Sequence, residues 1–133
     1  MENSVSLDQE NFIMSKLFDE NSTQEELYEN IGKKAFHDFI EGYDTSIFSY
    51  GTLGSGKTYS MLGTDEVRKF FVENTNTQLP FSLEKKAGII PRICIDIIKQ
   101  IDDLKLLGNI CKLKVSYIEN YLNSINWLIR GKK

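Results

Sequence analysis

The stretch Gly51-Thr52-Leu53-Gly54-Ser55-Gly56-Lys57-Thr58 has the pattern G-x-x-x-x-G-K-[ST], which is the phosphate-binding P-loop. Glycines let the backbone approach a phosphate closely, and successive N–H groups then point inward around the anion. In this pattern Lys57 reaches the β/γ-phosphates, and the hydroxyl of Thr58 ligates Mg²⁺. The stretch therefore predicts a nucleotide phosphate site.

The residues on either side of this loop have the order that the motif requires. Residues 46–50 (Ser-Ile-Phe-Ser-Tyr) are rich in β-branched and aromatic side chains and predict a short buried strand. Residues 58–62 can begin a helix that ends at Gly63, so the helix dipole would also face the phosphate. The alternative is a glycine-rich turn that binds nothing.

Composition limits the class of protein. The 133 residues suffice for one domain or part of one, and 41% apolar with 26% charged residues is typical of a soluble globular chain. The net charge of −3 provides no overall basic field, which argues against nucleic acid as a partner. Cys94 and Cys111 have no metal-ligand spacing and are interpreted as reduced core thiols. The first residues lack a signal-peptide pattern and no apolar run approaches about 20 residues, so we expect a cytosolic chain without a membrane span.

The first 42 residues predict a strand and a helix. Residues 1–11 are polar and expected to be frayed, and residues 12–18 predict a strand. Two overlapping capping boxes precede a helix with an apolar stripe over 27–40 that ends at Gly42. These boxes pair Ser22 with Glu25 or Thr23 with Glu26. His37 lies off the centre of the stripe, which favours a solvated helix residue over a catalytic base.

The second half predicts a loop, a helix and a strand. Residues 64–87 form a long polar segment, interpreted as a loop that is either functional or, more simply, a tolerated surface insertion. Residues 88–104 predict a helix with Pro91 in its first turn, and residues 111–118 alternate as a half-buried strand. Glu119 could imitate a Walker-B acid, although a solvated carboxylate at a strand end is the simpler interpretation. Residues 121–129 suggest one short helical or irregular apolar segment.

Several stretches besides the P-loop occur in a characteristic order. They are Phe12 to Phe18 (as F-x-F-D-x-V-F), Phe18 to Tyr28 (F-D-E-N-S-T-Q-E-E-V-Y), Glu41 to Tyr50 (E-G-Y-N-x-T-I-F-A-Y), Gly51 to Gly63 (G-Q-T-G-S-G-K-T-Y-T-M-x-G), Gly88 to Arg92 (G-I-I-P-R) and Val115 to Tyr121 (V-S-Y-x-E-I-Y). Over residues 12–129 the chain thus resembles the N-terminal half of a kinesin motor domain. It departs from that pattern at Ser15, Thr52-Leu53, Asn120 and Trp127.

The resemblance implies a fold, a function and a site. The fold is α/β, a P-loop NTPase with the three-layer sheet of a kinesin motor domain, present here incompletely as one partial domain over 1–133. The implied function is ATP-driven movement on microtubules, with ATP and Mg as cofactors, microtubules as partner and the cytoplasmic cytoskeleton as location. The implied nucleotide-binding residues are Gly51, Thr52, Leu53, Gly54, Ser55, Gly56, Lys57, Thr58 and Tyr59, with Thr58 on the metal and Tyr59 against the adenine.

Other parts of the family pattern do not occur in the 133 residues. The R-x-R-P segment would precede them, and switch I (N-x-x-S-S-R-S-H) and switch II (D-L-A-G-S-E) would follow, so we expect a truncated motor domain that does not hydrolyse ATP alone and in which we assign no catalytic residue. Its three predicted strands would not be neighbours in the parent sheet, so their edges would be unpaired.

Two alternatives to a motor remain. One is a non-catalytic remnant or interaction protein. The other is a small independent P-loop kinase or GTPase, which would need motifs such as N-K-x-D or D-x-x-G, and neither occurs.

Overall fold

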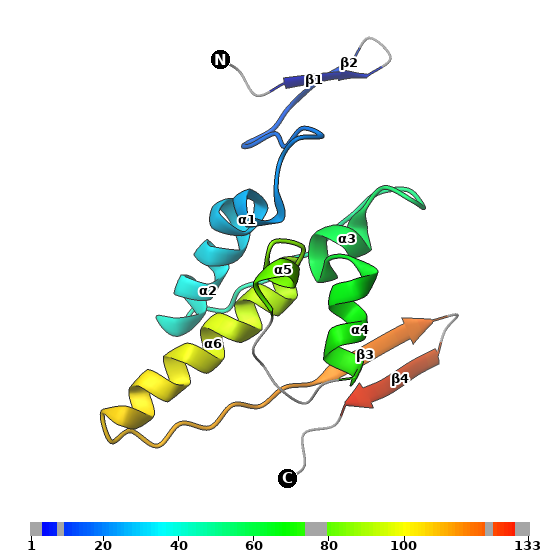
Figure 1. Ribbon diagram of the computed structural model, residues 1–133. Coiled ribbons are helices and arrows are strands. Elements are labelled where there is room, and N and C mark those ends of the chain that lie inside the picture. Colours follow the sequence, from blue (N-terminus) through cyan, green and yellow to red (C-terminus); the bar gives the residue numbers. More distant parts are fainter. Residues whose placement is uncertain (1–3, 8–9, 74–79, 122–123, 130–133) are drawn as a thin grey trace. The chain divides into compact units, whose positions relative to one another are not determined.

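The computed structural model describes residues 4–7, 10–73, 80–121 and 124–129 (Figure 1). The chain divides into two compact units, Met1–Ile98 and Lys99–Lys133, and each is described by itself. The first unit contains the P-loop and most of the helices.

The first unit begins with a hairpin. Strands β1 (Ser4–Leu7) and β2 (Glu10–Ile13) are antiparallel, with Ser4 opposite Ile13. The expectation of a frayed N-terminus is therefore wrong for these residues, and the strand expected over 12–18 ends at Ile13. The polar segment forms a ladder because β2 finds its partner only a few residues away in the chain.

The first helical stretch lies where the sequence predicts it. It consists of α1 (Gln24–Leu27), a π-helical turn η1 (Tyr28–Gly32) and α2 (Lys33–Ile40). Of the two possible N-caps the structure uses Thr23, whose Oγ1 accepts the Glu26 N–H at 3.1 Å. Gly42 follows the helix with φ of 94°, the left-handed conformation that favours glycine at a helix end. His37 is an exposed helix residue, as expected.

The expected loop over 64–87 contains two helices. After α3 (Lys57–Leu62) come α4 (Asp65–Glu73) and α5 (Phe81–Glu84), so the expectation of a structureless loop is wrong for these residues. Val67 of α4 is fully buried, and this burial stabilises the helix within a segment whose loops are polar. An isolated bridge between Gly63 and Ala87 closes the base of the segment.

The long helix α6 (Ile89–Leu106) confirms the helix predicted after Gly88. Its first half and α2 line an apolar groove of about 300 Å³, to which Phe36, Phe39, Ile93 and Ile97 contribute. The buried aliphatic and aromatic side chains of the described residues are few: Tyr28, Val67, Ala87 and Ile89. The apolar stripes of the two helices are thus only partly covered: Phe39 and Ile40 of α2 are exposed, whereas Ile93 and Ile97 of α6 are half-buried.

The second unit holds the end of α6 and a second hairpin. Strands β3 (Tyr117–Tyr121) and β4 (Ser124–Ile129) are antiparallel, with an irregularity between Tyr117 and Ile118. Residues 109–116 have no regular structure, so the strand expected over 111–118 exists only from Tyr117 onward. The apolar segment over 121–129, expected to be helical or irregular, is a strand from Ser124.

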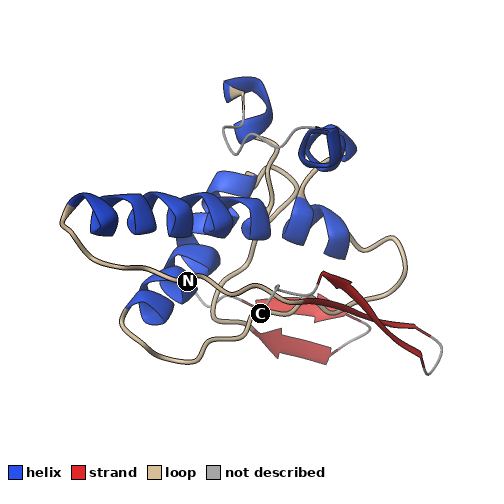
Figure 2. Cartoon of the chain, turned by 90° about the horizontal axis from the view of Figure 1, so that it is seen from below, coloured by secondary structure: helices blue, strands red, loops and turns tan. Residues whose placement is uncertain are grey.

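The central sheet expected from the resemblance is not formed by the described residues. Their strands form two separate two-stranded ladders, seen as the red arrows of Figure 2. Residues 46–50, expected as the strand before the P-loop, have no regular structure, and Phe48 and Tyr50 are 85% and 95% exposed. A strand of this kind needs a neighbour for its N–H and C=O groups, and none pairs with it here.

Candidate functional site

The P-loop of this chain is a tight backbone loop that leads directly into α3. Gly54 and Gly56 have φ of 79° and 87°, a conformation that other residues adopt at a cost. The Ser55 N–H donates to the Thr52 carbonyl at 3.3 Å, which closes the turn. Glycine thus occupies the two positions of the loop where these φ values require it.

Lys57 is folded back over its own loop. Its Nζ donates to the Gly51 carbonyl at 2.9 Å and to the Thr52 carbonyl at 2.5 Å. The ammonium group is thus held against the first two residues of the loop. Lys57 is also the first residue of α3, so its backbone position is fixed by that helix.

The loop is tight at Gly51. A Cβ on Gly51 would lie 2.5 Å from Ser55 Oγ, so a larger residue there would displace the Ser55 side chain. Thr58, next to Lys57, is exposed and offers one hydroxyl ligand. Among the residues that the structure describes, no group of three or more His, Cys, Asp or Glu side chains converges as a metal site of its own. A divalent cation here would depend on Thr58 and on phosphate oxygens.

The remaining predicted site residues lie on the outside. Leu53, at the tip of the loop, is fully exposed, and Tyr59 is 53% exposed on α3. A hollow of about 150 Å³ lies beside Tyr59 and Ser60, with Phe18, Asp19 and Thr23 on its other side. The P-loop and Tyr59 are thus brought together by one short helix, without the expected strand before them.

Gln24 lies near the site, and the amino-acid sequence alone does not identify it. Gln24 is 3% exposed, and its Nε2 donates to the Tyr59 carbonyl at 2.7 Å. The two residues are 35 positions apart, so no local spacing indicates the contact. Glutamine at the start of a helix is ordinarily a solvated residue.

A second polar link joins the first helical stretch to α6. The Tyr28 hydroxyl donates to Asp96 Oδ2, and the Arg92 guanidinium lies 5.9 Å from the centre of the Tyr28 ring. Burial, together with this hydrogen bond, raises the pKa of Tyr28. Arg92 also donates to the Ala87 and Glu84 carbonyls, at 3.0 and 2.7 Å, at the base of the 64–87 segment.

The two cysteine thiols lie outside the core. Cys94 and Cys111 are free, as expected, but Cys94 is exposed and Cys111 half-buried, so neither is a core residue. None of the helices in the described part of the chain has the length and apolarity that a bilayer crossing requires. The backbone of Glu119 lies in β3, and the structure does not describe its side chain.

Comparison with known proteins identifies the family. The sequence profile described as kinesin motor domain matches residues 1–133. The chain belongs to the kinesin motor domain family. It is 33% identical over 118 residues to kinesin-like protein KIF18A of Mus musculus, which covers 89% of this chain and 11% of that protein. It is 33% identical over 134 residues to kinesin heavy chain of Drosophila melanogaster, covering 99% of this chain and 12% of that protein.

A third kinesin is similar to this chain to about the same extent. Kinesin-like protein KIP1 of Saccharomyces cerevisiae is 31% identical over 126 residues, covering 95% of this chain and 11% of that protein. The chain thus spans about a tenth of the length of these relatives. Kinesin motor domains are α/β P-loop NTPases that bind nucleotide, so membership confirms the resemblance and the general fold class, while the central sheet is not formed by the described residues.

Proposed function

We propose that residues 51–59 are the ATP site of a kinesin motor. Gly51, Gly54, Ser55 and Gly56 surround the phosphates, with Thr52 and Leu53 completing the loop. Lys57 pairs with the β/γ-phosphates, Thr58 ligates Mg²⁺ and Tyr59 lies beside the base. The observation that supports this proposal is that the Lys57 ammonium group is bonded to the carbonyls of Gly51 and Thr52, within a loop whose Gly54 and Gly56 have positive φ.

The whole protein would then use this site for movement. Family membership supports an ATP-driven motor that moves on microtubules and is located on the cytoskeleton. The match over residues 1–133 favours this over a small independent kinase or GTPase. The 133-residue polypeptide itself would bind nucleotide without turning it over, because the two switch motifs that orient water and sense the γ-phosphate do not occur in its sequence.

Titration with a fluorescent ATP analogue in the presence of Mg²⁺ tests the site. Lys57→Ala should weaken binding by about 1.5–3 kcal/mol, because it removes a charge-assisted hydrogen bond to phosphate. Lys112→Ala is the matched control, since Lys112 is an exposed lysine in the irregular segment 109–116. Equal affinity of the wild type and Lys57→Ala would contradict the assignment.

Phosphate release measured with and without polymerised tubulin tests the second part. We expect no stimulation by microtubules for the 133-residue polypeptide. A several-fold stimulation would show that these residues contain both a hydrolysis machinery and a track-binding surface.

A further inference from the structure

Gln24 has a buried polar side chain that contacts the P-loop helix but is not among the residues proposed to bind nucleotide. It is 3% exposed, and its Nε2 donates to the Tyr59 carbonyl at 2.7 Å. Its Oε1 is buried and has no hydrogen-bond partner among the described residues. Turning the amide over would bring Oε1 against the Tyr59 carbonyl oxygen, so the donating orientation is the favourable one.

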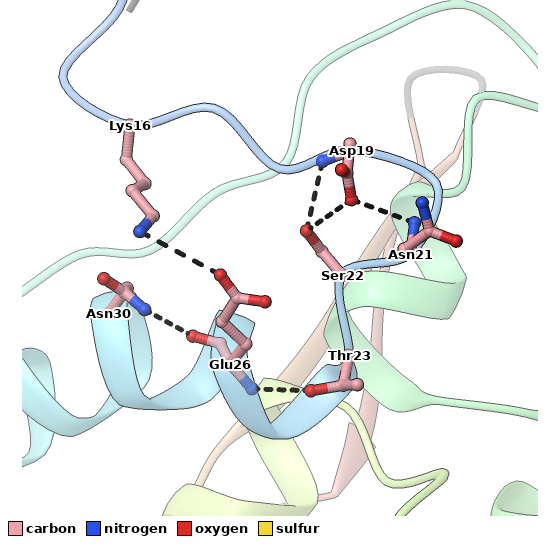
Figure 3. A network of polar contacts seen from close by, with 7 residues as sticks. All are labelled: Lys16, Asp19, Asn21, Ser22, Thr23, Glu26 and Asn30. Atoms are coloured by element: carbon pink, nitrogen blue, oxygen red, sulfur yellow. Dashed lines mark hydrogen bonds and ion pairs between the residues drawn. The ribbon is translucent and has the colours of Figure 1, made fainter. Parts of the chain in front are cut away.

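Gln24 is held in place by the turn before it. Figure 3 shows that turn: Ser22 Oγ donates to Asp19 Oδ1 at 3.1 Å, and Asp19 Oδ1 also accepts the Asn21 N–H at 2.9 Å. Thr23 then caps α1 by accepting the Glu26 N–H, and Gln24 is the first residue of that helix. The backbone at Gln24 is therefore fixed by local contacts that do not involve the P-loop.

The group that Gln24 holds lies within the helix that carries the P-loop lysine. α3 has six residues, and helices this short are marginal unless tertiary contacts support them. The Tyr59 carbonyl accepts the Gly63 N–H at 2.8 Å inside α3, and Gln24 adds a bond to the same oxygen from another element. That added bond connects α1 to the helix whose first two residues are Lys57 and Thr58.

The Oε1 of Gln24 gains no hydrogen bond from the described residues. A buried acceptor without a partner opposes folding, and an apolar side chain of the same length would avoid that penalty. Among the described residues, the side-chain hydrogen bond of Gln24 goes to Tyr59 in the P-loop helix.

We propose that Gln24 is a positioning residue for the nucleotide site: its amide holds α3 through the Tyr59 carbonyl and thereby fixes where Lys57 and Thr58 stand. The proposal rests on the proposed function of the P-loop. It predicts that loss of the amide loosens α3 and weakens nucleotide binding without weakening the rest of the fold.

Gln24→Met tests this, because methionine keeps the length of the side chain and removes both polar atoms. We expect the affinity for the Mg²⁺-bound fluorescent ATP analogue to fall by about 3- to 10-fold, the range that one lost hydrogen bond gives. We also expect faster hydrogen exchange of the backbone amides over 57–63 and a melting temperature no lower than that of the wild type. Gln100→Met, the same substitution at a half-buried position in α6, should change neither affinity nor exchange over 57–63.

Three results would overturn the proposal. The first is wild-type affinity together with wild-type exchange over 57–63 in Gln24→Met. The second is a loss of affinity accompanied by a lower melting temperature and faster exchange in α2 and α6, because that pattern belongs to general destabilisation. The third result needs only the wild type and applies if the variant does not fold. It is that bound nucleotide slows hydrogen exchange over 57–63 and leaves hydrogen exchange over 22–28 unchanged.

Failure of the proposed function gives a different result. If the wild type binds no nucleotide, the P-loop assignment is wrong. Faster exchange over 57–63 in Gln24→Met would then still support the link from Gln24 to α3, and unchanged exchange would overturn it.

Discussion

Gly63 and Gly88 contact each other backbone to backbone. A Cβ on Gly88 would lie 2.6 Å from the Gly63 nitrogen, and a Cβ on Gly63 would lie 2.8 Å from the Gly88 nitrogen. The two glycines follow α3 and precede α6, so the 64–87 segment leaves and rejoins the fold at one place. Only glycines allow this close approach.

Gly88→Ala should therefore destabilise the first unit. The new methyl group would collide with backbone atoms of Met61, Leu62 and Gly63, which cannot move as a flexible side chain would. We expect a loss of about 1–3 kcal/mol in the free energy of unfolding, measured by urea titration with circular dichroism. Gly108→Ala is the control, since its Cβ would meet nothing within 4 Å and only its φ of 85° would be strained. An equal or smaller loss for Gly88→Ala would contradict the contact.

Tyr28→Phe should change how stability depends on pH. The folded state raises the pKa of Tyr28 above its ordinary value of 10.0, so folding favours the protonated hydroxyl. This contribution is fully present below pH 10 and is lost as the pH rises beyond it. The wild type should lose stability above pH 10 more steeply than Tyr28→Phe, which cannot ionise. At pH 7 the variant should be less stable by about 1 kcal/mol, because the hydrogen bond to Asp96 is gone. Parallel pH curves for the two proteins would contradict the buried link.

Thr58→Val should remove the contribution of Mg²⁺ to nucleotide affinity. Valine has nearly the shape of threonine but no hydroxyl to ligate a cation. We expect the variant to bind the fluorescent ATP analogue equally well with Mg²⁺ and with a chelator, whereas the wild type should bind more tightly with Mg²⁺. Thr45→Val, which lies outside the P-loop, should behave as the wild type. A full Mg²⁺ effect in Thr58→Val would place the cation elsewhere.

The exposed apolar residues before the P-loop predict dye binding. Phe48 and Tyr50 are 85% and 95% exposed in a segment without regular structure. The isolated polypeptide should bind an apolar fluorescent dye, and the double substitution Phe48→Ser with Tyr50→Ser should reduce the signal without lowering helix content. Unchanged fluorescence would show that this segment is covered in solution.

The helices over 24–40 and 89–106 and the backbone turn of the P-loop could be predicted because their signals are local. A cap such as Thr23, an apolar stripe over 27–40 and a glycine at a helix end all act within a few residues. The P-loop is likewise one continuous stretch, so its glycines and Lys57 are adjacent in the chain and in the fold. Gln24 could not be found in this way, because its partner is 35 residues distant.

The strands could not be predicted for a physical reason. Residues 46–50 and 111–116 have strand-like composition, but a strand forms only where a second segment provides its hydrogen bonds. In the described residues the pairs that do form, β1 with β2 and β3 with β4, join near neighbours in the chain. The two helices of the 64–87 segment were missed for the opposite reason, because a polar composition concealed two buried residues, Val67 and Ala87.

The bonds from Lys57 to the Gly51 and Thr52 carbonyls also affect the energetics of binding. The two carbonyls use two of the three N–H donors of the ammonium group, which leaves one for a phosphate oxygen. At the proposed site, any further bond to phosphate would be made at the expense of a carbonyl bond, so the gain would be the difference between phosphate and carbonyl as acceptors. In return the side chain is ordered before the nucleotide arrives, so less rotamer entropy is lost on binding than for a freely moving lysine.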